Sequence, residues 1–163
     1  MMTTPPNPAR VATIRQEDPA QPEVVALLRN GEADSAALYP AESNHHMILE
    51  GLRASNVRFL VARDAEGRAV ATGALVEHGD WAEIKRIWVE EHARGRGLSR
   101  QMLDALLAEA DRAGMAILRL ETGIVSHTAL ALYERTGFVR RGPFADYTDD
   151  PLSVFMERRL RAA

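Results

Sequence analysis

The sequence of 163 residues contains no cysteine, which excludes disulfide bonds, thiolate metal ligands and a cysteine nucleophile. It contains a single lysine, Lys85, among 20 lysines and arginines, which are outnumbered by 23 aspartates and glutamates. The formal net charge of -3 argues against a nucleic-acid binder, which usually carries a clustered basic excess. We therefore expect no nucleic-acid partner.

Long apolar runs are also lacking. No stretch approaches the roughly 18 apolar residues that span a bilayer, so we expect no membrane association. The N-terminus has neither the basic start nor the apolar run of a secretory signal. Its prolines, at positions 5, 6 and 8, predict a disordered tail over residues 1–9. The expected protein is cytoplasmic, with a single domain over residues 10–163 that is long enough for one core.

The most informative segment is an arginine- and glycine-rich turn, Arg94-Gly95-Arg96-Gly97-Leu98-Ser99, between an apolar strand and an amphipathic helix. Glycines let the backbone approach a ligand closely, and the N–H groups at the start of the helix attract anions. A P-loop would need a lysine in the turn, and a dinucleotide fingerprint would need a third glycine where Arg100 stands. The turn predicts a phosphate site of another kind, with an ordinary strand-to-helix turn as the alternative.

Hydrophobic periodicity predicts the order of the other elements. A strand over 10–16 precedes two helices, the first bearing Val24 and Leu28 and the second capped by Ser43. Three antiparallel strands follow, over 57–63, 69–76 and a segment ending at Val89. Next come a helix over 98–114, a strand over 115–122 parallel to the strand before it, a helix over 126–136, and strands over 138–140 and 152–160.

The turn resembles the pyrophosphate loop of the GNAT superfamily of acetyl-CoA-dependent N-acetyltransferases, with Ser99 in place of the last small residue. Trp81–Val89 resembles the fourth strand of that family, and Ala129–Phe138 resembles its last helix and the strand after it. Segments 39–45, 120–123 and 142–151 resemble a bacterial subgroup labelled auxin-type or small-molecule acetyltransferases. The resemblance implies an α+β fold, the GNAT fold, with a mixed, mostly antiparallel sheet of about seven strands and four helices.

The resemblance also implies that acetyl-CoA is the co-substrate. The main chain of the fourth strand would receive the pantetheine arm where the fourth and fifth strands splay apart, and the arginines and N–H groups of the turn would hold the pyrophosphate. Ser126 stands where many relatives have an asparagine near the cofactor. The expected cofactor-binding residues are Ile87, Trp88, Val89, Arg94, Gly95, Arg96, Gly97, Leu98, Ser99, Arg100 and Ser126.

Two residues are the expected catalytic groups. Tyr133 matches the family tyrosine that donates a proton to the departing thiolate, although a helical tyrosine is otherwise a core residue. An amine with a pKa of about 10.4 is mostly protonated at neutral pH, so a base is needed. Glu83 is the expected base and Glu121 its rival; the alternative for Glu83 is a solvent-facing carboxylate paired with Lys85 or Arg86.

The expected function is transfer of an acetyl group from acetyl-CoA to a primary amine of a small molecule by direct attack. Loops over 39–46 and 144–151 should line the acceptor site. The alternatives are a protein N-terminal or lysine acetyltransferase and a non-catalytic acyl-CoA-binding regulatory module. The adjacent His45 and His46 lack further ligands at suitable spacing, so no metal is expected. A homodimer is a further hypothesis.

Overall fold

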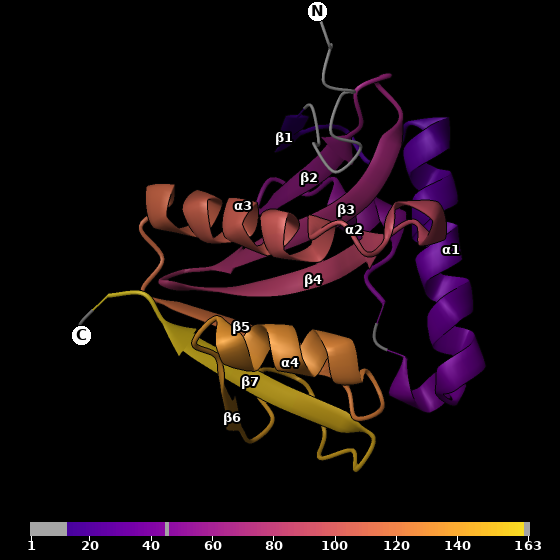
Figure 1. The fold of residues 1–163 in the computed structure, drawn as a ribbon. Coiled ribbons are helices and arrows are strands. Elements are labelled where there is room, and N and C mark those ends of the chain that lie inside the picture. Colours follow the sequence, from indigo (N-terminus) through magenta and orange to yellow (C-terminus); the bar gives the residue numbers. More distant parts are fainter. Residues whose placement is uncertain (1–12, 45, 162–163) are drawn as a thin grey trace, which may run out of the picture.

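The computed structural model describes residues 13–44 and 46–161, which form one sheet with helices on both faces (Figure 1). The predicted tail over 1–9, the start of the first predicted strand and His45 lie outside the described residues. The strands are β1 (Thr13–Gln16), β2 (Val57–Arg63), β3 (Ala69–His78), β4 (Trp81–Val89), β5 (Ile117–Gly123), β6 (Val139–Arg141) and β7 (Ser153–Arg159). The α-helices are α1 (Pro22–Leu38), α2 (Leu49–Leu52), α3 (Leu98–Arg112) and α4 (His127–Arg135).

The seven described strands lie in the order β1-β2-β3-β4-β5-β7-β6. All neighbouring pairs are antiparallel except β4 and β5, which are parallel and joined through α3. A parallel pair needs such a crossover, since a tight turn cannot return the chain to the same end of the sheet. The predicted α+β GNAT fold, with its mixed sheet and four helices, is confirmed.

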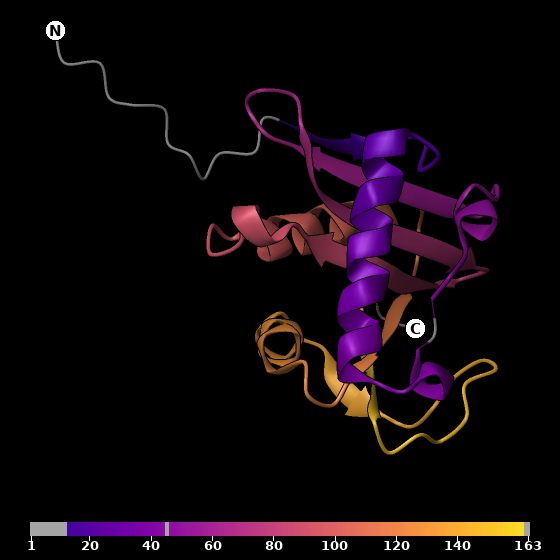
Figure 2. The same cartoon turned by 90° about the vertical axis from the view of Figure 1, so that its right-hand side faces the viewer.

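Each face of the sheet has its own apolar core. Buried side chains of α3 and α4, such as Met102 and Leu130, pack on one face with Leu118 and Met156 of the sheet. On the other face, α1 and α2 pack mainly on β2 and β3. Figure 2 shows α1 crossing the sheet from the β1 side toward the half formed by β5 and β7. The C-terminal end of α1 is thereby brought to the second half of the sheet.

The pairing of β4 with β5 stops before either strand ends. Residues 81–84 pair with residues 117–120, and no pairing joins the remaining residues of the two strands. The strands diverge beyond Ile84 and Leu120, toward the right in Figure 1. Backbone groups over 85–89 of β4 on that side are therefore not used by β5, as the resemblance implied for a strand that receives a cofactor arm.

A bulge in β4 changes which side chains face α1. Thr72 pairs with Trp88 and Ala74 pairs with Lys85, so two β4 residues stand opposite Gly73. Arg86, one of those two, has a φ of 60°, and its carbonyl accepts a hydrogen bond of 2.9 Å from the Thr72 hydroxyl. One face of the sheet consequently carries Trp81, Glu83 and Lys85 before the bulge, Arg86 within it and Trp88 after it.

The predicted start of the second helix is wrong. Ser43 ends a short 3-10 helix over Ala41–Ser43, and α2 begins only at Leu49, after Ile48. The Ser43 hydroxyl instead donates a hydrogen bond of 2.6 Å to Asp150 in the loop between β6 and β7. Ser43 thus makes a tertiary contact and not the helix cap that the local sequence predicted. The other predicted elements are present, and their ends differ from the predicted ones by a few residues.

Candidate active site

A cavity of about 720 Å³ lies where β4 and β5 diverge. Its wall comes from α1, β4 from Glu83 onward, the start of α3, the end of β5, one side of α4 and the loop between β6 and β7. Most of the predicted site residues line it: Glu83, Ile87, Trp88, Val89, Arg94, Gly95, Gly97, Leu98, Ser99, Arg100, Ser126 and Tyr133. Arg96 is not part of the lining. The cavity therefore brings together residues from five helices and strands and from the loops between them.

The arginine-glycine turn over 94–99, hereafter the phosphate turn, leads directly into α3. Gly95 and Gly97 have φ angles of 78° and 76°, a left-handed conformation that favours glycine. A Cβ at either position would meet no heavy atom within 4 Å, so the space above the turn is open. No side chain caps the start of α3. Its first N–H groups are thus available to an anion at the cavity wall, which fits a pyrophosphate.

Arg94 is held in place by two contacts from β4. Its Nε donates a hydrogen bond of 3.1 Å to the carbonyl of Val89, and its guanidinium carbon lies 4.8 Å from the centroid of the Trp88 ring. The Trp88 ring is itself fixed against α1, because a Cβ at Gly31 would touch it at 3.5 Å. Sequence analysis placed Trp88 in the site for its main chain. Its side chain has a separate role, which is to orient Arg94 at the cavity.

Tyr133 lies in α4, lines the cavity and is 7% exposed. Its ring packs edge-on against Phe138, with centroids 5.7 Å apart. Burial and then the charge of Glu121 raise the pKa of Tyr133 to about 12. Among the described residues, none hydrogen-bonds to its hydroxyl. Tyr133 therefore packs as a core residue, lines the cavity and keeps its hydroxyl protonated at neutral pH. Its role as the proton donor stays a prediction.

Glu83 forms a compact cluster with Lys85 and Tyr147, hereafter the acceptor cluster. The Tyr147 hydroxyl donates a hydrogen bond of 2.6 Å to Glu83 Oε2, and Lys85 Nζ lies 3.4 Å from the same oxygen. Lys85 Nζ also donates to the Tyr147 hydroxyl at 2.8 Å. The Glu83 side chain is 8% exposed, so the alternative of a solvent-facing carboxylate is wrong. Its predicted pairing with Lys85 is present, while Arg86 pairs with Glu32 at 2.9 Å.

Tyr147 lines the cavity, and the sequence had placed it only within the loop over 144–151, without a role of its own. It lies in the loop between β6 and β7, and its ring is wedged between Phe144 and Phe155 at centroid distances of 5.1 and 5.4 Å. Burial, followed by the charge of Glu83, raises the pKa of the Tyr147 hydroxyl well above its ordinary value. The hydroxyl therefore remains a donor. The spacing of Phe144 and Tyr147 was a signal available in the sequence, but nothing local indicated that Tyr147 contacts β4.

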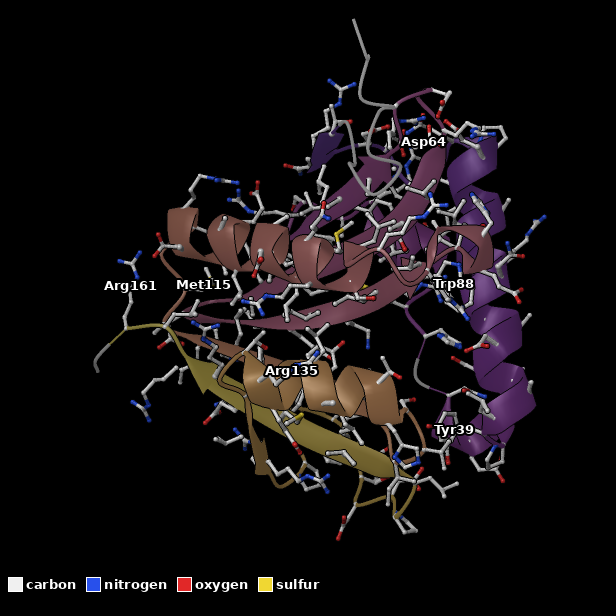
Figure 3. All side chains as sticks on the ribbon, in the orientation of Figure 1. Tyr39, Asp64, Trp88, Met115, Arg135 and Arg161 are labelled. Carbon is white, nitrogen blue, oxygen red and sulfur yellow. The ribbon has the colours of Figure 1, made fainter. Side chains whose placement is uncertain are left out.

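Tyr39 connects the end of α1 to the segment before α4. Its hydroxyl lies 3.0 Å from the Ser126 hydroxyl and accepts a hydrogen bond of 3.2 Å from the backbone N–H of Val125. Figure 3 shows Tyr39 at the end of α1 that is nearer α4, well away from Trp88. A Cβ at Gly123 would collide with the Tyr39 hydroxyl end, so glycine is required for this approach. Ser126 thus contacts a side chain of α1 and does not cap α4.

The remaining loop predictions agree with the cavity lining. Tyr39, Ser43, Asn44 and His46 from the first predicted loop line it, as does Tyr147 from the second. Over residues 13–44 and 46–161, no group of three or more histidines and carboxylates could hold a metal ion. None of the helices described is both long enough and apolar enough to cross a membrane.

Comparison with known proteins identifies the same family that the sequence motifs resemble. Residues 21–138 match the model of the acetyltransferase (GNAT) family. The chain is 44% identical over 150 residues to the IAA acetyltransferase of Azospirillum brasilense, covering 91% of this chain and 97% of that one. It is 35% identical to the N-acetyltransferase YsnE of Bacillus subtilis, a protein described as uncharacterized, over 90% of this chain and 99% of that one.

A solved structure agrees in fold as well as in sequence. A Klebsiella pneumoniae protein provisionally classed as an acyl-CoA N-acyltransferase superposes with a TM-score of 0.79 at 36% identity, covering 94% of this chain and 99% of that one. The family match spans most of the chain, including β4, the phosphate turn and Tyr133. The chain therefore belongs to the GNAT family of acetyltransferases, whose acyl donor is acetyl-CoA, and is an N-acetyltransferase.

Proposed function

We propose that the protein transfers an acetyl group from acetyl-CoA to a primary amine of a small molecule by direct attack. The observation that carries the proposal is one cavity lined by the phosphate turn, by Tyr133 and by Glu83. A donor site and a protonatable carboxylate thus face the same space. The named relatives, an IAA acetyltransferase among them, support an N-acetyltransferase reaction of this kind.

The donor end of the cavity suits a coenzyme A thioester, which supplies an acetyl group activated for transfer. The N–H groups at the start of α3, with Arg94 and Arg100, would hold the pyrophosphate. The backbone of Ile87, Trp88 and Val89 would bind the pantetheine arm, since β5 does not pair with this part of β4. Arg96 stays a predicted contact that the cavity lining does not include.

Two protons leave nitrogen and one reaches sulfur when the ammonium form of the acceptor reacts. Glu83 takes the first proton and passes it to solvent, which frees the nitrogen lone pair for attack. A bond then forms between the amine nitrogen and the acetyl carbon, the carbon–sulfur bond breaks, and the electron pair leaves with sulfur. Glu83 takes the second proton from nitrogen, the Tyr133 hydroxyl gives a proton to the sulfur, and Tyr133 is reprotonated from solvent. The raised pKa of Tyr133, about 12, keeps that hydroxyl protonated at neutral pH. No acyl-enzyme is needed, and the chain has no cysteine to form a thioester.

The side opposite the phosphate turn supports a small acceptor over a polypeptide. Tyr39 joins α1 to the start of α4 through Ser126, and Ser43 joins the segment after α1 to the β6–β7 loop through Asp150. These contacts tie together segments that surround the cavity, which leaves less room for an extended peptide. A protein acetyltransferase would be better served by an open groove at this position.

The test is a screen of amines and amino acids in which released coenzyme A is measured with a thiol-reactive dye. The absence of cysteine removes the protein background from this assay. We expect rates well above hydrolysis with at least one small amine, and loss of that rate in Glu83→Gln. Turnover with peptide N-termini or lysine peptides alone would contradict the proposal, as would binding of acetyl-CoA without turnover over the whole panel.

A further inference from the structure

The only lysine of the chain lies in the acceptor cluster, beside a carboxylate. Lys85 is 16% exposed and Glu83 is 8% exposed, and both line the cavity. Their charged atoms are 3.4 Å apart, and the Tyr147 hydroxyl bridges them by donating to Glu83 and accepting from Lys85. The ring of Tyr147 is fixed by Phe144 and Phe155. The cavity therefore presents one positive and one negative group at a fixed, short separation.

We propose that the acetyl acceptor is a free α-amino acid with an apolar side chain. This rests on the proposed function and names its substrate class. In an α-amino acid the amine and the carboxylate are joined through one carbon, with bonds of about 1.5 Å on each side. The amine would face Glu83 and the carboxylate would face Lys85, so each charge meets its opposite. The same Glu83 then receives the proton that the amine must lose.

A simple amine is a poorer partner for this cluster. Its ammonium form would lie beside the Lys85 ammonium with no negative charge of its own, and like charges at such distances repel. A polyamine would bring further positive charge to the same place. An acceptor carboxylate removes the repulsion and adds an attraction, which is the electrostatic basis of the preference.

The mouth of the cavity supports an apolar side chain on the acceptor. Leu38, the last residue of α1, is 53% exposed, and Val125 before α4 is 47% exposed, yet both line the cavity. Tyr39 connects them, since it follows Leu38 in the chain and its hydroxyl accepts from the Val125 N–H. An apolar substituent reaching this rim would remove two large apolar side chains from water.

The first experiment compares matched acceptors that differ only in the carboxylate. L-phenylalanine, L-phenylalanine amide and phenethylamine share the amine and the ring. We expect kcat/KM to be about tenfold to 100-fold higher for L-phenylalanine than for either analogue, which is what a hydrogen bond to a charged group is worth. Equal values, or a preference for phenethylamine, would overturn the amino-acid inference.

Variants of Lys85 separate recognition from a structural effect. Lys85→Met keeps the length of the side chain and removes its charge. We expect the ratio of kcat/KM for L-phenylalanine to kcat/KM for phenethylamine to fall by about tenfold to 100-fold, chiefly because KM for L-phenylalanine rises. Lys85→Arg should restore part of the preference for L-phenylalanine. An equal loss for both substrates in Lys85→Met would show that the lysine only supports the fold.

Rim variants test the side-chain preference. Leu38→Ser and Val125→Ser should reduce the preference for L-phenylalanine over L-alanine by about threefold to tenfold each, because less apolar area is buried. Val139→Ser is the matched control: Val139 is 64% exposed on β6 and does not line the cavity. An unchanged preference in both rim variants, or an equal change in the control, would remove the apolar side chain from the inference.

Binding can be followed without turnover because Lys85 is the only lysine. Protein labelled with ¹³C and ¹⁵N at lysine gives one set of side-chain resonances, assigned without mutagenesis. In the presence of coenzyme A, L-phenylalanine should shift them more than phenethylamine does. Equal shifts contradict the inference. If no amine or amino acid is acetylated at all, the proposed function fails with it, whereas amine turnover without discrimination overturns only the substrate class.

Discussion

Tyr147 donates its hydroxyl proton to Glu83 Oε2 at 2.6 Å, and Lys85 approaches the same oxygen. In Tyr147→Phe the ring can remain between Phe144 and Phe155 while the donor is lost. If Glu83 is the base and Tyr147 orients it, kcat with a saturating acceptor should fall by about tenfold to 100-fold, the loss of one hydrogen bond to a charged group. The measurement is kcat and KM for the acceptor, with acetyl-CoA affinity measured separately.

A double variant separates this role from a purely structural one. Once Glu83→Gln has removed the base, Tyr147→Phe should lower kcat little further, because the two substitutions act through one contact. Tyr133→Phe is the matched control, because it removes the hydroxyl of another cavity tyrosine without touching Glu83. Additive losses in Glu83→Gln and Tyr147→Phe would show that Tyr147 only supports the fold.

Glu83→Gln tests the base directly. The change keeps the size of the side chain and its bond from Tyr147, but it removes basicity, so kcat with a saturating acceptor should fall by about 10²-fold to 10⁴-fold. Glu121→Gln is the control for the second carboxylate at the cavity. A slow Glu121→Gln beside a normal Glu83→Gln would move the base to β5. Normal rates in both would mean that the minor neutral amine reacts without a protein base.

Tyr133→Phe should lower turnover by about 10²-fold to 10⁴-fold while acetyl-CoA affinity changes little, because the ring stays packed against Phe138 and only the donor is lost. The pKa of about 12 adds a second expectation. Deprotonation of Tyr133 cannot cause a decline in rate between pH 7 and 9, so any basic limb there should persist in the variant. Near-native turnover in Tyr133→Phe would exclude it as the acid.

Local sequence patterns were enough to predict the fold, because buried positions carry apolar residues at regular spacing. The apolar stripe of α3 predicted that helix, and the polar segment 64–68 between two apolar runs predicted the hairpin of β2 and β3. The spacing of glycines and arginines predicted the phosphate turn, whose glycines adopt positive φ angles. The parallel pairing of β4 and β5 followed from the helical crossover between them.

The acceptor side could not be predicted in the same way. Tyr147 meets Glu83 across 64 residues, from a loop without periodicity. The bulge in β4 depends on Gly73 and Thr72 of the neighbouring strand, so β4 alone does not reveal that Lys85 and Arg86 share a face. Ser43 looked like a helix cap because its partner, Asp150, is 107 residues away. Long-range polar contacts of this kind leave no local signal.

Gly97→Val tests the phosphate turn by thermal unfolding. Acetyl-CoA at about 100 times its dissociation constant should stabilise the wild type by about 2.7 kcal/mol. A branched side chain at a φ of 76° is strained and would crowd the anion, so most of the acetyl-CoA shift should vanish. Gly67→Val is a matched control: its φ is 79°, its surroundings are equally open, and it lies in the turn between β2 and β3. It should lose stability but keep the shift. A full shift in Gly97→Val would remove the turn from the cofactor site.

Gly123→Ala tests whether Tyr39 closes the acceptor side. The added methyl group would collide with the end of the Tyr39 side chain, which can rotate away, so the fold should survive while the contacts to Ser126 and Val125 break. We expect KM for the acceptor to rise by about tenfold, because one or two hydrogen bonds are lost. The affinity for acetyl-CoA should not change. Gly142→Ala, where a Cβ meets open space, should have no effect.

The decisive measurement is the double variant. Once Tyr39→Ala has removed the ring, Gly123→Ala should raise KM no further, because the two substitutions act through one contact. Additive effects of the two would show that Gly123 matters to the end of β5 itself and that Tyr39 does not hold the cavity closed.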